Sequence, residues 1–208
     1  MSTILIFAGG EQPGAELADE LPAADLAIAA DGGYDLARRL DHPVAILVGD
    51  MDSIEATDIP ETVVVERHPP DKDQTDLELA FELAIREDPA RIVVVGGDGG
   101  RLDHELAAAG LICSPRWEGA GEIDWVSSRG WAHVVHRHRI IHADIGATVS
   151  LVPMGGPALG VTTSGLRWEL KDDVLEEGTT LGVSNVMNSP VAEIAITSGC
   201  LLVVLPVT

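Results

Sequence analysis

Val44-Ala-Ile-Leu-Val-Gly-Asp-Met-Asp-Ser53 combines a short apolar run with two closely spaced acids. The apolar half is partly β-branched, which is typical of a strand buried on both faces of a sheet. Asp50 and Asp52 follow directly where this strand is expected to end, at Gly49. Ligands of open α/β sheets bind beyond the carboxyl ends of the strands, and paired carboxylates there suit Mg²⁺. An ordinary acidic loop is the alternative interpretation of an isolated Asp-x-Asp.

The alternation of apolar runs with helical stretches continues through the N-terminal half of the chain. Apolar runs lie at 3–9, 25–31, 44–49, 62–66 and 91–95, and helical stretches lie at about 34–40, 76–87 and 102–113. Such alternation predicts an α/β N-terminal domain with a mostly parallel sheet and helices on both faces.

Short β-rich runs without a convincing helix between them make up the rest of the chain. They lie at 123–127, 131–136, 139–142, 147–153, 166–170, 193–197 and 200–207. Glycine, proline or acidic turns separate these runs, which predicts a smaller all-β, sandwich-like C-terminal domain. The first run can instead complete the N-terminal sheet, so we expect the border between 120 and 145. We assign residues 1–130 and 131–208 to the two domains.

The charge balance limits the classes of partner. Thirteen Lys and Arg residues stand against 34 Asp and Glu residues, a formal net charge of −21. This charge repels nucleic-acid backbones and anionic membranes, so we expect neither as a partner. A phosphate-bearing substrate would need metal ions and local positive dipoles to approach.

Targeting signals and cysteine usage favour a cytoplasmic protein. No apolar run approaches the ~18–20 residues that span a bilayer. The first residues lack the basic front and cleavage signal of a secretory leader. Cys113 and Cys200 lie in apolar surroundings and are expected to be buried free thiols.

A second cluster, rich in acids, occupies residues 69–78. Thr75 and Glu78 have the spacing of a capping box, which predicts that a helix begins at Asp76. Capping explains those two residues, but one carboxylate is enough to meet a helix dipole. The surplus of acid beside Lys72 indicates a counter-ion, most simply a metal.

A third cluster, Gly96-Gly-Asp-Gly-Gly-Arg-Leu-Asp-His104, joins an expected strand to an expected helix. Its glycines let backbone N–H groups turn toward an anion at the helix N-terminus, where Arg101 can hold a phosphate oxygen. Asp103 is either the N-cap of the helix, a ligand of metal or substrate, or both. The spacing matches neither the Walker loop nor the Rossmann fingerprint. Asp31, at the end of another strand, is a helix cap or a member of the same site.

These motifs together resemble those of the thiamine pyrophosphokinase family. The N-terminal matches are Ala30–Gly33, Gly49–Ile54, Asp71–Asp76 and Gly99–His104, and the C-terminal matches are Gly165–Leu170 and Gly182–Asn185. Met51 stands where the family usually has Phe, a soft apolar exchange that should not alter ligation. The linker at about 115–145 matches no motif of the family.

The resemblance implies the reaction of thiamine with ATP to give thiamine diphosphate and AMP, with Mg²⁺ as cofactor. It implies catalytic roles for Asp50, Asp52, Asp76 and Asp103, the first three of which we expect to hold the metal. It implies that ATP or substrate is bound by Asp31, Lys72, Thr75, Gly99, Gly100, Arg101 and His104. Thiamine would be bound by Trp168, Ser184 and Asn185. The family is homodimeric, with thiamine between the α/β domain of one subunit and the β domain of its partner.

Other functions are compatible with parts of this pattern. A related diphosphokinase could act on another small alcohol, such as a hydroxymethylpterin, although Trp168 and Ser184-Asn185 weigh against it. A sugar-nucleotide transferase would explain Asp50 and Asp52 but not the later clusters. A thiamine- or nucleotide-binding module without turnover is the alternative outside enzymes. Trp168 itself can also be read as a core residue of a small β domain.

A dense group of histidines lies outside these motifs, at His133, His136, His138 and His142. His136 and His138 would share one face of a strand, and His133 would point the other way. We therefore expect exposed or interfacial histidines, with transition-metal binding as the alternative.

Overall fold

The computed structural model describes residues 2–56 and 58–207, which divide into two compact units. The N-terminal unit comprises the described part of Met1–Leu111 together with Gly119–Arg129, and the C-terminal unit comprises Ile112–Glu118 and the described residues from Gly130 onward. The chain therefore contributes a short segment to the C-terminal unit, returns to the N-terminal unit for one strand, and then remains in the C-terminal unit.

The N-terminal unit is built on parallel strands, as predicted. These are β1 (Thr3–Ala8), β2 (Leu26–Ala30), β3 (Ile46–Gly49), β4 (Val64–Arg67), β5 (Arg91–Gly96) and β6 (Glu122–Ser127). They lie in the order β6-β5-β1-β2-β3-β4, and every neighbouring pair is parallel. Strand β6 is the first of the β-rich runs that follow residue 120, so this run completes the N-terminal sheet.

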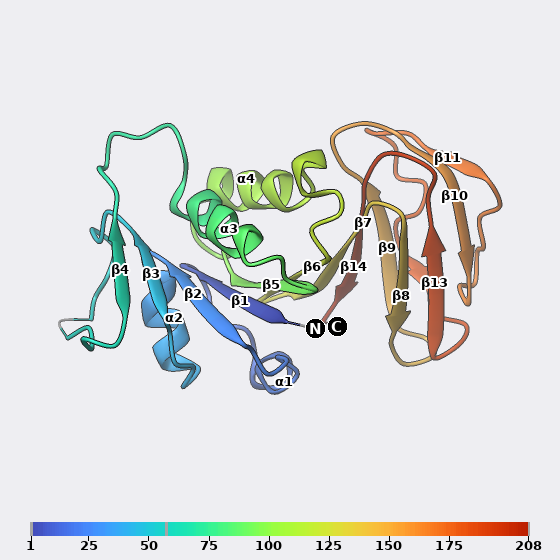
Figure 1. Ribbon diagram of the computed structural model, residues 1–208. Helices are drawn as coiled ribbons and strands as arrows, with labels where there is room; N and C mark the ends of the chain where they lie inside the picture. The colour runs from blue at the N-terminus through green and yellow to red at the C-terminus, as the bar shows by residue number, and fades with distance from the viewer. Residues whose placement is uncertain (1, 57, 208) are drawn as a thin grey trace. The chain divides into compact units, whose positions relative to one another are not determined.

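In the described part of the chain the strands are connected by four α-helices: α1 (Ala15–Asp19), α2 (Gly33–Arg39), α3 (Asp76–Arg86) and α4 (Leu102–Ile112). Figure 1 shows α3 and α4 on one face of the sheet and α2 on the other, which confirms the predicted α/β class. Helix α3 begins as the sequence predicts, because the Thr75 hydroxyl accepts a hydrogen bond of 3.2 Å from the Glu78 N–H. Its buried face carries Leu79, Ala80, Phe81 and Ala84.

The strand order places a topological switch beside β1. From β1 the chain proceeds outward through β2, β3 and β4, and then returns to β5 on the other side of β1. The turns that leave β1 and β5 therefore run in opposite directions. A crevice opens at such a point at the carboxyl ends of the strands, and ligands bind there in open α/β folds.

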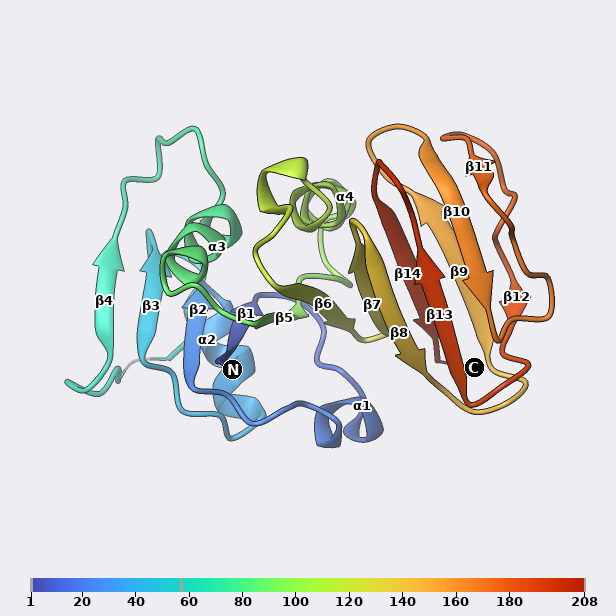
Figure 2. The same cartoon turned by 45° about the vertical axis from the view of Figure 1, so that its right-hand side comes forward.

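The C-terminal unit is a two-layer antiparallel β structure (Figures 1 and 2). One layer has the order β12-β9-β14-β7 and the other β11-β10-β13-β8. Apolar side chains from both layers fill the interior, among them Leu151 and Val203 from the first and Val161 and Ile194 from the second. This arrangement confirms the predicted sandwich. Its elements are a 3₁₀ turn (Pro115–Trp117), β7 (Gly130–Val135), β8 (His138–His142), β9 (Thr148–Pro153), β10 (Ala158–Ser164), β11 (Asp173–Leu175), β12 (Asn185–Val186), β13 (Val191–Ala195) and β14 (Leu201–Pro206).

One predicted strand of the C-terminal unit is wrong. Residues 166–170 do not form a strand, and the strand in this region is β10, at Ala158–Ser164. Strand β10 ends at Ser164, and the Gly165 that follows it has a left-handed φ of 77°. The Asn185 side chain then bonds the backbone of Trp168 on both sides, accepting from its N–H at 3.2 Å and donating to its carbonyl at 2.8 Å. These bonds occupy backbone groups that a strand would use for its ladder.

The cysteines and histidines of the C-terminal unit lie outside the predicted site motifs. Cys113 and Cys200 are free and buried, as predicted. His138 is exposed and contacts Glu193 at 2.7 Å, and the exposed His142 lies at the end of β8. His136 falls in the turn between β7 and β8 rather than on the strand face predicted for it. None of the described helices has the length and apolar character needed to cross a bilayer.

Candidate active site

A cleft of about 660 Å³ lies at the carboxyl ends of the strands of the N-terminal unit. Its walls come from the turns after β1, β2, β3 and β5, from the beginning of α3 and from most of the length of α4. The predicted site residues on its surface are Asp31, Asp50, Asp52, Lys72, Thr75, Asp76, Gly100, Arg101 and His104. The structure thus brings residues from all four predicted motifs of this unit into one cavity.

Three carboxylates converge within the cleft. Oxygens of Asp31, Asp50 and Asp76 all lie within 4.8 Å of one another. The parallel register pairs Ala30 with Val48, so Asp31 lies beside Gly49. A Cβ atom at Gly49 would come within 3.0 Å of the Asp31 Cβ and 3.1 Å of the Asp76 Oδ1. Glycine at this position therefore allows the acidic side chains to approach one another.

The environment of Asp31 disfavours its charge. Asp31 is 9% exposed, and its Oδ1 has no hydrogen-bond partner among the described residues. Burial raises the pKa of Asp31, a hydrogen bond from Ser53 lowers it, and the charges of Asp76, Asp50 and Asp52 raise it further. A buried, unpartnered oxygen beside two other carboxylates is unfavourable without a cation. The all-oxygen donor set fits a hard divalent cation such as Mg²⁺.

Asp52 and Lys72 complete the electrostatics of the cleft. The sequence predicted Asp50, Asp52 and Asp76 as the metal ligands. In the structure the compact carboxylate group consists of Asp31, Asp50 and Asp76, so Asp31 and not Asp52 is its third member. Asp52 lies on the same cleft surface and accepts a hydrogen bond of 2.8 Å from Ser53. The Lys72 Nζ lies 3.1 Å from the Asp76 Oδ1 and 3.8 Å from the Asp50 Oδ2. Lys72 therefore offsets part of the negative charge.

Asp31→Asn is expected to stabilise the metal-free protein at pH 7. Because the folded state raises the pKa of Asp31, this group favours folding below its unfolded pKa and loses that contribution as pH rises through its folded pKa. Replacing the charged carboxylate with a neutral amide removes the cost of burying the charge and then its repulsion by the neighbouring carboxylates, which should raise Tm by about 2–4 °C at pH 7, on the scale of 1 kcal/mol for a chain of this size. Thermal unfolding without Mg²⁺ measures this change.

The matched control is Asp88→Asn. Asp31 and Asp88 both have a left-handed backbone, with φ of 46° and 49°, but Asp88 is exposed. Any benefit from the tolerance of Asn for this conformation should therefore appear in both variants. Adding Mg²⁺ should raise Tm more in the wild type than in Asp31→Asn. A lower Tm for metal-free Asp31→Asn than for the wild type would contradict the proposed repulsion.

Arg101 and Asp103 form an exposed pair at the start of α4. The Arg101 Nε lies 3.1 Å from Asp103 Oδ1, and its Nη2 lies 2.5 Å from Oδ2. Hydrogen bonding from Arg101 lowers the pKa of Asp103 to about 2. Helix α4 begins at Leu102, so Asp103 lies in the first turn of the helix and not at its cap. Of the site residues predicted in the N-terminal unit, all of which are described, Asp103 and Gly99 do not line the cleft.

A second, smaller pocket of about 190 Å³ lies in the C-terminal unit. It is lined by Trp168, Leu170, Thr180, Leu181, Gly182, Val183 and Asn185. Trp168 is 55% exposed, so it is not a core tryptophan. The Arg167 guanidinium lies 5.0 Å from the centre of the Trp168 ring. Ser184 does not line the pocket; its N–H donates to Ser150 Oγ at 3.0 Å.

Solved structures define the class of this fold. A thiamine pyrophosphokinase structure from Bacillus subtilis superposes with a TM-score of 0.84 at 23% identity and covers 99% of both chains. A thiamin pyrophosphokinase structure from Candida albicans superposes with a TM-score of 0.77 at 11% identity, covering 100% of this chain and 89% of that one. At these identities the likeness shows a shared two-part fold, an α/β unit followed by a β sandwich.

Sequence comparisons identify the family. A family model described as thiamin pyrophosphokinase, catalytic domain, matches residues 17–120, and one described as the vitamin B1 binding domain matches 136–201. Thiamine pyrophosphokinase 1 of Arabidopsis thaliana is 31% identical over 197 residues, covering 79% of this chain and 72% of that one. Thiamine pyrophosphokinase 1 of rice is 27% identical over 175 residues, covering 75% and 64%. The chain belongs to the thiamine pyrophosphokinase family, and it spans 64% and 59% of the lengths of the first two curated relatives.

Proposed function

We propose that this protein is a thiamine diphosphokinase, which transfers the β,γ-diphosphate of ATP to the hydroxyl of thiamine and releases AMP. The observation that carries this proposal is the convergence of Asp31, Asp50 and Asp76 in the cleft at the switch point of the sheet. Membership of the family supports the identity of the substrates. The related alternative, a diphosphokinase for a hydroxymethylpterin, has no comparable support.

The acidic residues of the cleft would hold Mg²⁺. Asp50 and Asp76 lie in the compact group together with Asp31, and Asp52 shares the cleft wall. Bound there, Mg²⁺ would neutralise charge on the triphosphate and favour in-line displacement at phosphorus.

The protein's own cations and dipoles would bind the nucleotide. Arg101 lies on the cleft and can donate to a phosphate oxygen in exchange for one of its contacts with Asp103, while the remaining contact keeps the guanidinium oriented. The glycine turn at Gly99-Gly100 leads into the N-terminus of α4, where backbone N–H groups favour anions. Lys72, Thr75 and His104 line the remaining wall.

The transfer itself needs little covalent help from the protein. The hydroxyl oxygen of thiamine would attack the β-phosphorus, and the bond to the oxygen bridging the α- and β-phosphorus would break. That oxygen would leave with AMP. Asp31 and Asp103 are proposed to orient the nucleotide or the attacking hydroxyl, whose proton passes to a cleft carboxylate or to water.

The pocket around Trp168 would bind thiamine. The exposed indole offers a face on which a cationic aromatic ring can stack, and Asn185 holds the backbone of Trp168 in place. Ser184 precedes Asn185 in a left-handed conformation, with φ of 59°. We further propose a homodimer with thiamine at the subunit interface, which rests on the family resemblance, and a cytoplasmic location, where ATP and Mg²⁺ are available.

One assay tests the proposed reaction. The protein is mixed with Mg²⁺, ATP and thiamine, and the nucleotide product is identified by chromatography. AMP together with thiamine diphosphate is the expected result. ADP would point to an ordinary kinase, and thiamine binding without any nucleotide product would point to a binding module. Product formation with a hydroxymethylpterin but not with thiamine would favour the related diphosphokinase.

Trp168→Ala is expected to raise the KM for thiamine about fivefold, because it removes a stacking surface worth on the order of 1 kcal/mol. The KM for ATP should change little, since the cleft lies in the other unit. Val174→Ala is the control, because Val174 is also an exposed apolar residue, at 41%, but does not line the pocket. An unchanged thiamine KM in Trp168→Ala would exclude the stacking role.

A further inference from the structure

The Asp98 carboxylate is a buried charge at the wall of the cleft. Asp98 lies in the glycine-rich turn between β5 and α4, lines the cleft, and is 1% exposed. A buried carboxylate is costly unless it is hydrogen-bonded and paired with a cation. The hydrogen-bond donors and cations around Asp98 must therefore offset the cost of burying its charge.

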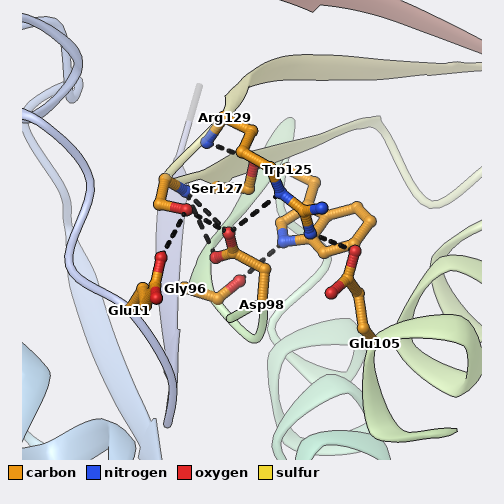
Figure 3. Close-up of polar contacts among 8 residues, drawn as sticks. Glu11, Gly96, Asp98, Glu105, Trp125, Ser127 and Arg129 are labelled. Atoms are coloured by element: carbon orange, nitrogen blue, oxygen red, sulfur yellow. Dashed lines mark hydrogen bonds and ion pairs between the residues drawn. The ribbon is translucent and has the colours of Figure 1, made fainter. Parts of the chain in front are cut away.

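The partners of Asp98 come from the segment that follows β6. The Ser128 N–H donates to Oδ2 at 3.0 Å and to Oδ1 at 3.2 Å, and the Ser128 hydroxyl donates to Oδ2 at 2.5 Å. The Arg129 Nε lies 3.7 Å from Oδ2. Figure 3 shows the Arg129 guanidinium between Asp98 and Glu105 of α4, with which it also forms an ion pair. Two consecutive residues therefore stabilise the Asp98 carboxylate: Ser128 supplies its hydrogen bonds and Arg129 its opposite charge.

The turn that carries Asp98 is also bonded to the turn after β1. The Glu11 N–H donates to the Asp98 carbonyl at 2.9 Å, and the Gly97 N–H donates to the Gly9 carbonyl at 3.1 Å. Ser128 Oγ also lies 3.2 Å from Glu11 Oε2, but it has one proton, which it donates to Asp98 at the shorter distance of 2.5 Å, so the two backbone bonds are what join the turns. The backbone of Gly10 packs so closely that a Cβ there would overlap the Asp98 carbonyl oxygen.

We infer that Asp98 is a positioning residue. Together with Glu11, Ser128 and Arg129 it forms a clamp, called here the Asp98 clamp, that fixes the turn Gly97–Gly100 so that its backbone can receive the phosphates of a nucleotide. The buried Trp125 indole, which donates to the Gly96 carbonyl at 2.6 Å, fixes the start of the same turn (Figure 3). This inference rests on the proposed function for the identity of the ligand.

Phosphate binding is the role that the position of the clamp favours. The turn leads directly into the N-terminus of α4, and Gly100 and Arg101 line the cleft beside Asp98. Backbone N–H groups bind an anion best when they are already ordered, because ordering them on binding costs conformational entropy. The glycines supply flexibility that the clamp removes again.

The variants Asp98→Asn, Ser128→Ala and Ser128→Thr test the clamp. An Asn amide at position 98 lacks the charge that pairs with Arg129 and has one acceptor oxygen in place of two. Affinity for a non-hydrolysable ATP analogue with Mg²⁺, measured by calorimetry, should fall about tenfold in Asp98→Asn and about threefold in Ser128→Ala. Ser128→Thr keeps the hydroxyl donor and should retain wild-type affinity. The KM for thiamine should stay unchanged in all three.

Hydrogen–deuterium exchange of residues 96–101 provides a readout that does not depend on turnover. Exchange there should accelerate in Asp98→Asn and Ser128→Ala but not in Ser128→Thr. The double variant Asp98→Asn/Ser128→Ala should lose no more affinity for the ATP analogue than Asp98→Asn alone, because the two residues act as a unit. The inference would be overturned if a folded Asp98→Asn protein bound the analogue and exchanged its amide hydrogens as the wild type does. If Asp98→Asn does not fold, wild-type affinity and wild-type exchange in Ser128→Ala would overturn it. A wild type that binds the analogue but forms no AMP would overturn the proposed function and leave the clamp standing.

Discussion

Asp76→Asn is expected to lower the rate of AMP formation by about 10³-fold or more while leaving the protein folded, a loss typical of removing a main electrostatic group from an active site. Asp76 contributes to the compact carboxylate group and contacts Lys72 at 3.1 Å. The amide of Asn keeps the size of the side chain but lacks the charge that would hold Mg²⁺. Steady-state AMP formation, together with circular dichroism to verify folding, measures this effect.

The control for Asp76→Asn is Asp73→Asn. Both acids come from the same segment before α3, but Asp73 is exposed and does not line the cleft. Its replacement removes the same charge from the chain and should change the rate by less than about twofold, as exposed charges have little effect at a distance. A rate for Asp76→Asn within tenfold of the wild type would show that the carboxylate group is not the centre of the reaction.

Gly33→Ala should destabilise the protein by about 3 kcal/mol or more, the upper range for overpacking a rigid core. Gly33 is buried at the start of α2, and a Cβ there would overlap the carbonyl group of Phe7 and lie 2.9 Å from the Ala8 nitrogen. Strand β1 is at the centre of the sheet and cannot yield without losing its pairing with β2 and β5. Thermal unfolding should show a Tm lower by about 6 °C or more.

Gly110→Ala is the matched control for this substitution. Gly110 is also a helical glycine, in α4, but apart from its chain neighbours and the backbone of its own helix no atom of the described residues lies within 4 Å of the position of an added Cβ. Alanine there should stabilise the protein slightly, by about 0.5–1 kcal/mol, because glycine is a poor helix former. Equal Tm changes in the two variants would show that helix propensity, and not the close approach of α2 to β1, sets the effect.

Most of the secondary structure of the N-terminal unit could be predicted from short-range sequence patterns. The order of strands and helices follows from apolar runs and helical periodicity, and the start of α3 follows from Thr75 and Glu78. The same patterns failed at residues 166–170, where apolar residues alternate as in a strand. There the side chain of Asn185 bonds the backbone of Trp168, and nothing near position 168 in the sequence signals this contact.

The candidate site was predictable as a set of motifs but not as a geometry. The acids after β2 and β3 are recognisable because they follow apolar runs, and Asp76 is recognisable because the capping box of Thr75 and Glu78 marks the start of α3. The partnership of Asp98 with Ser128 has no sequence signal, because the two residues are 30 positions apart and meet through the pairing of β5 with β6. Ser128 was therefore missed, and Asp98 was seen only as part of a glycine-rich turn.

The sequence by itself determined the α/β and β-sandwich classes, the helix cap at Thr75 and the acids available to the cleft, because periodicity and capping depend on near neighbours. Tertiary structure decided which acids meet. The register of β2 against β3 places Asp31 beside Gly49, where it joins Asp50 and Asp76. Asp52 lies beyond the left-handed Met51, whose φ is 71°, and outside that compact group. Such convergence depends on strand register and chain reversal, which distant parts of the chain set together.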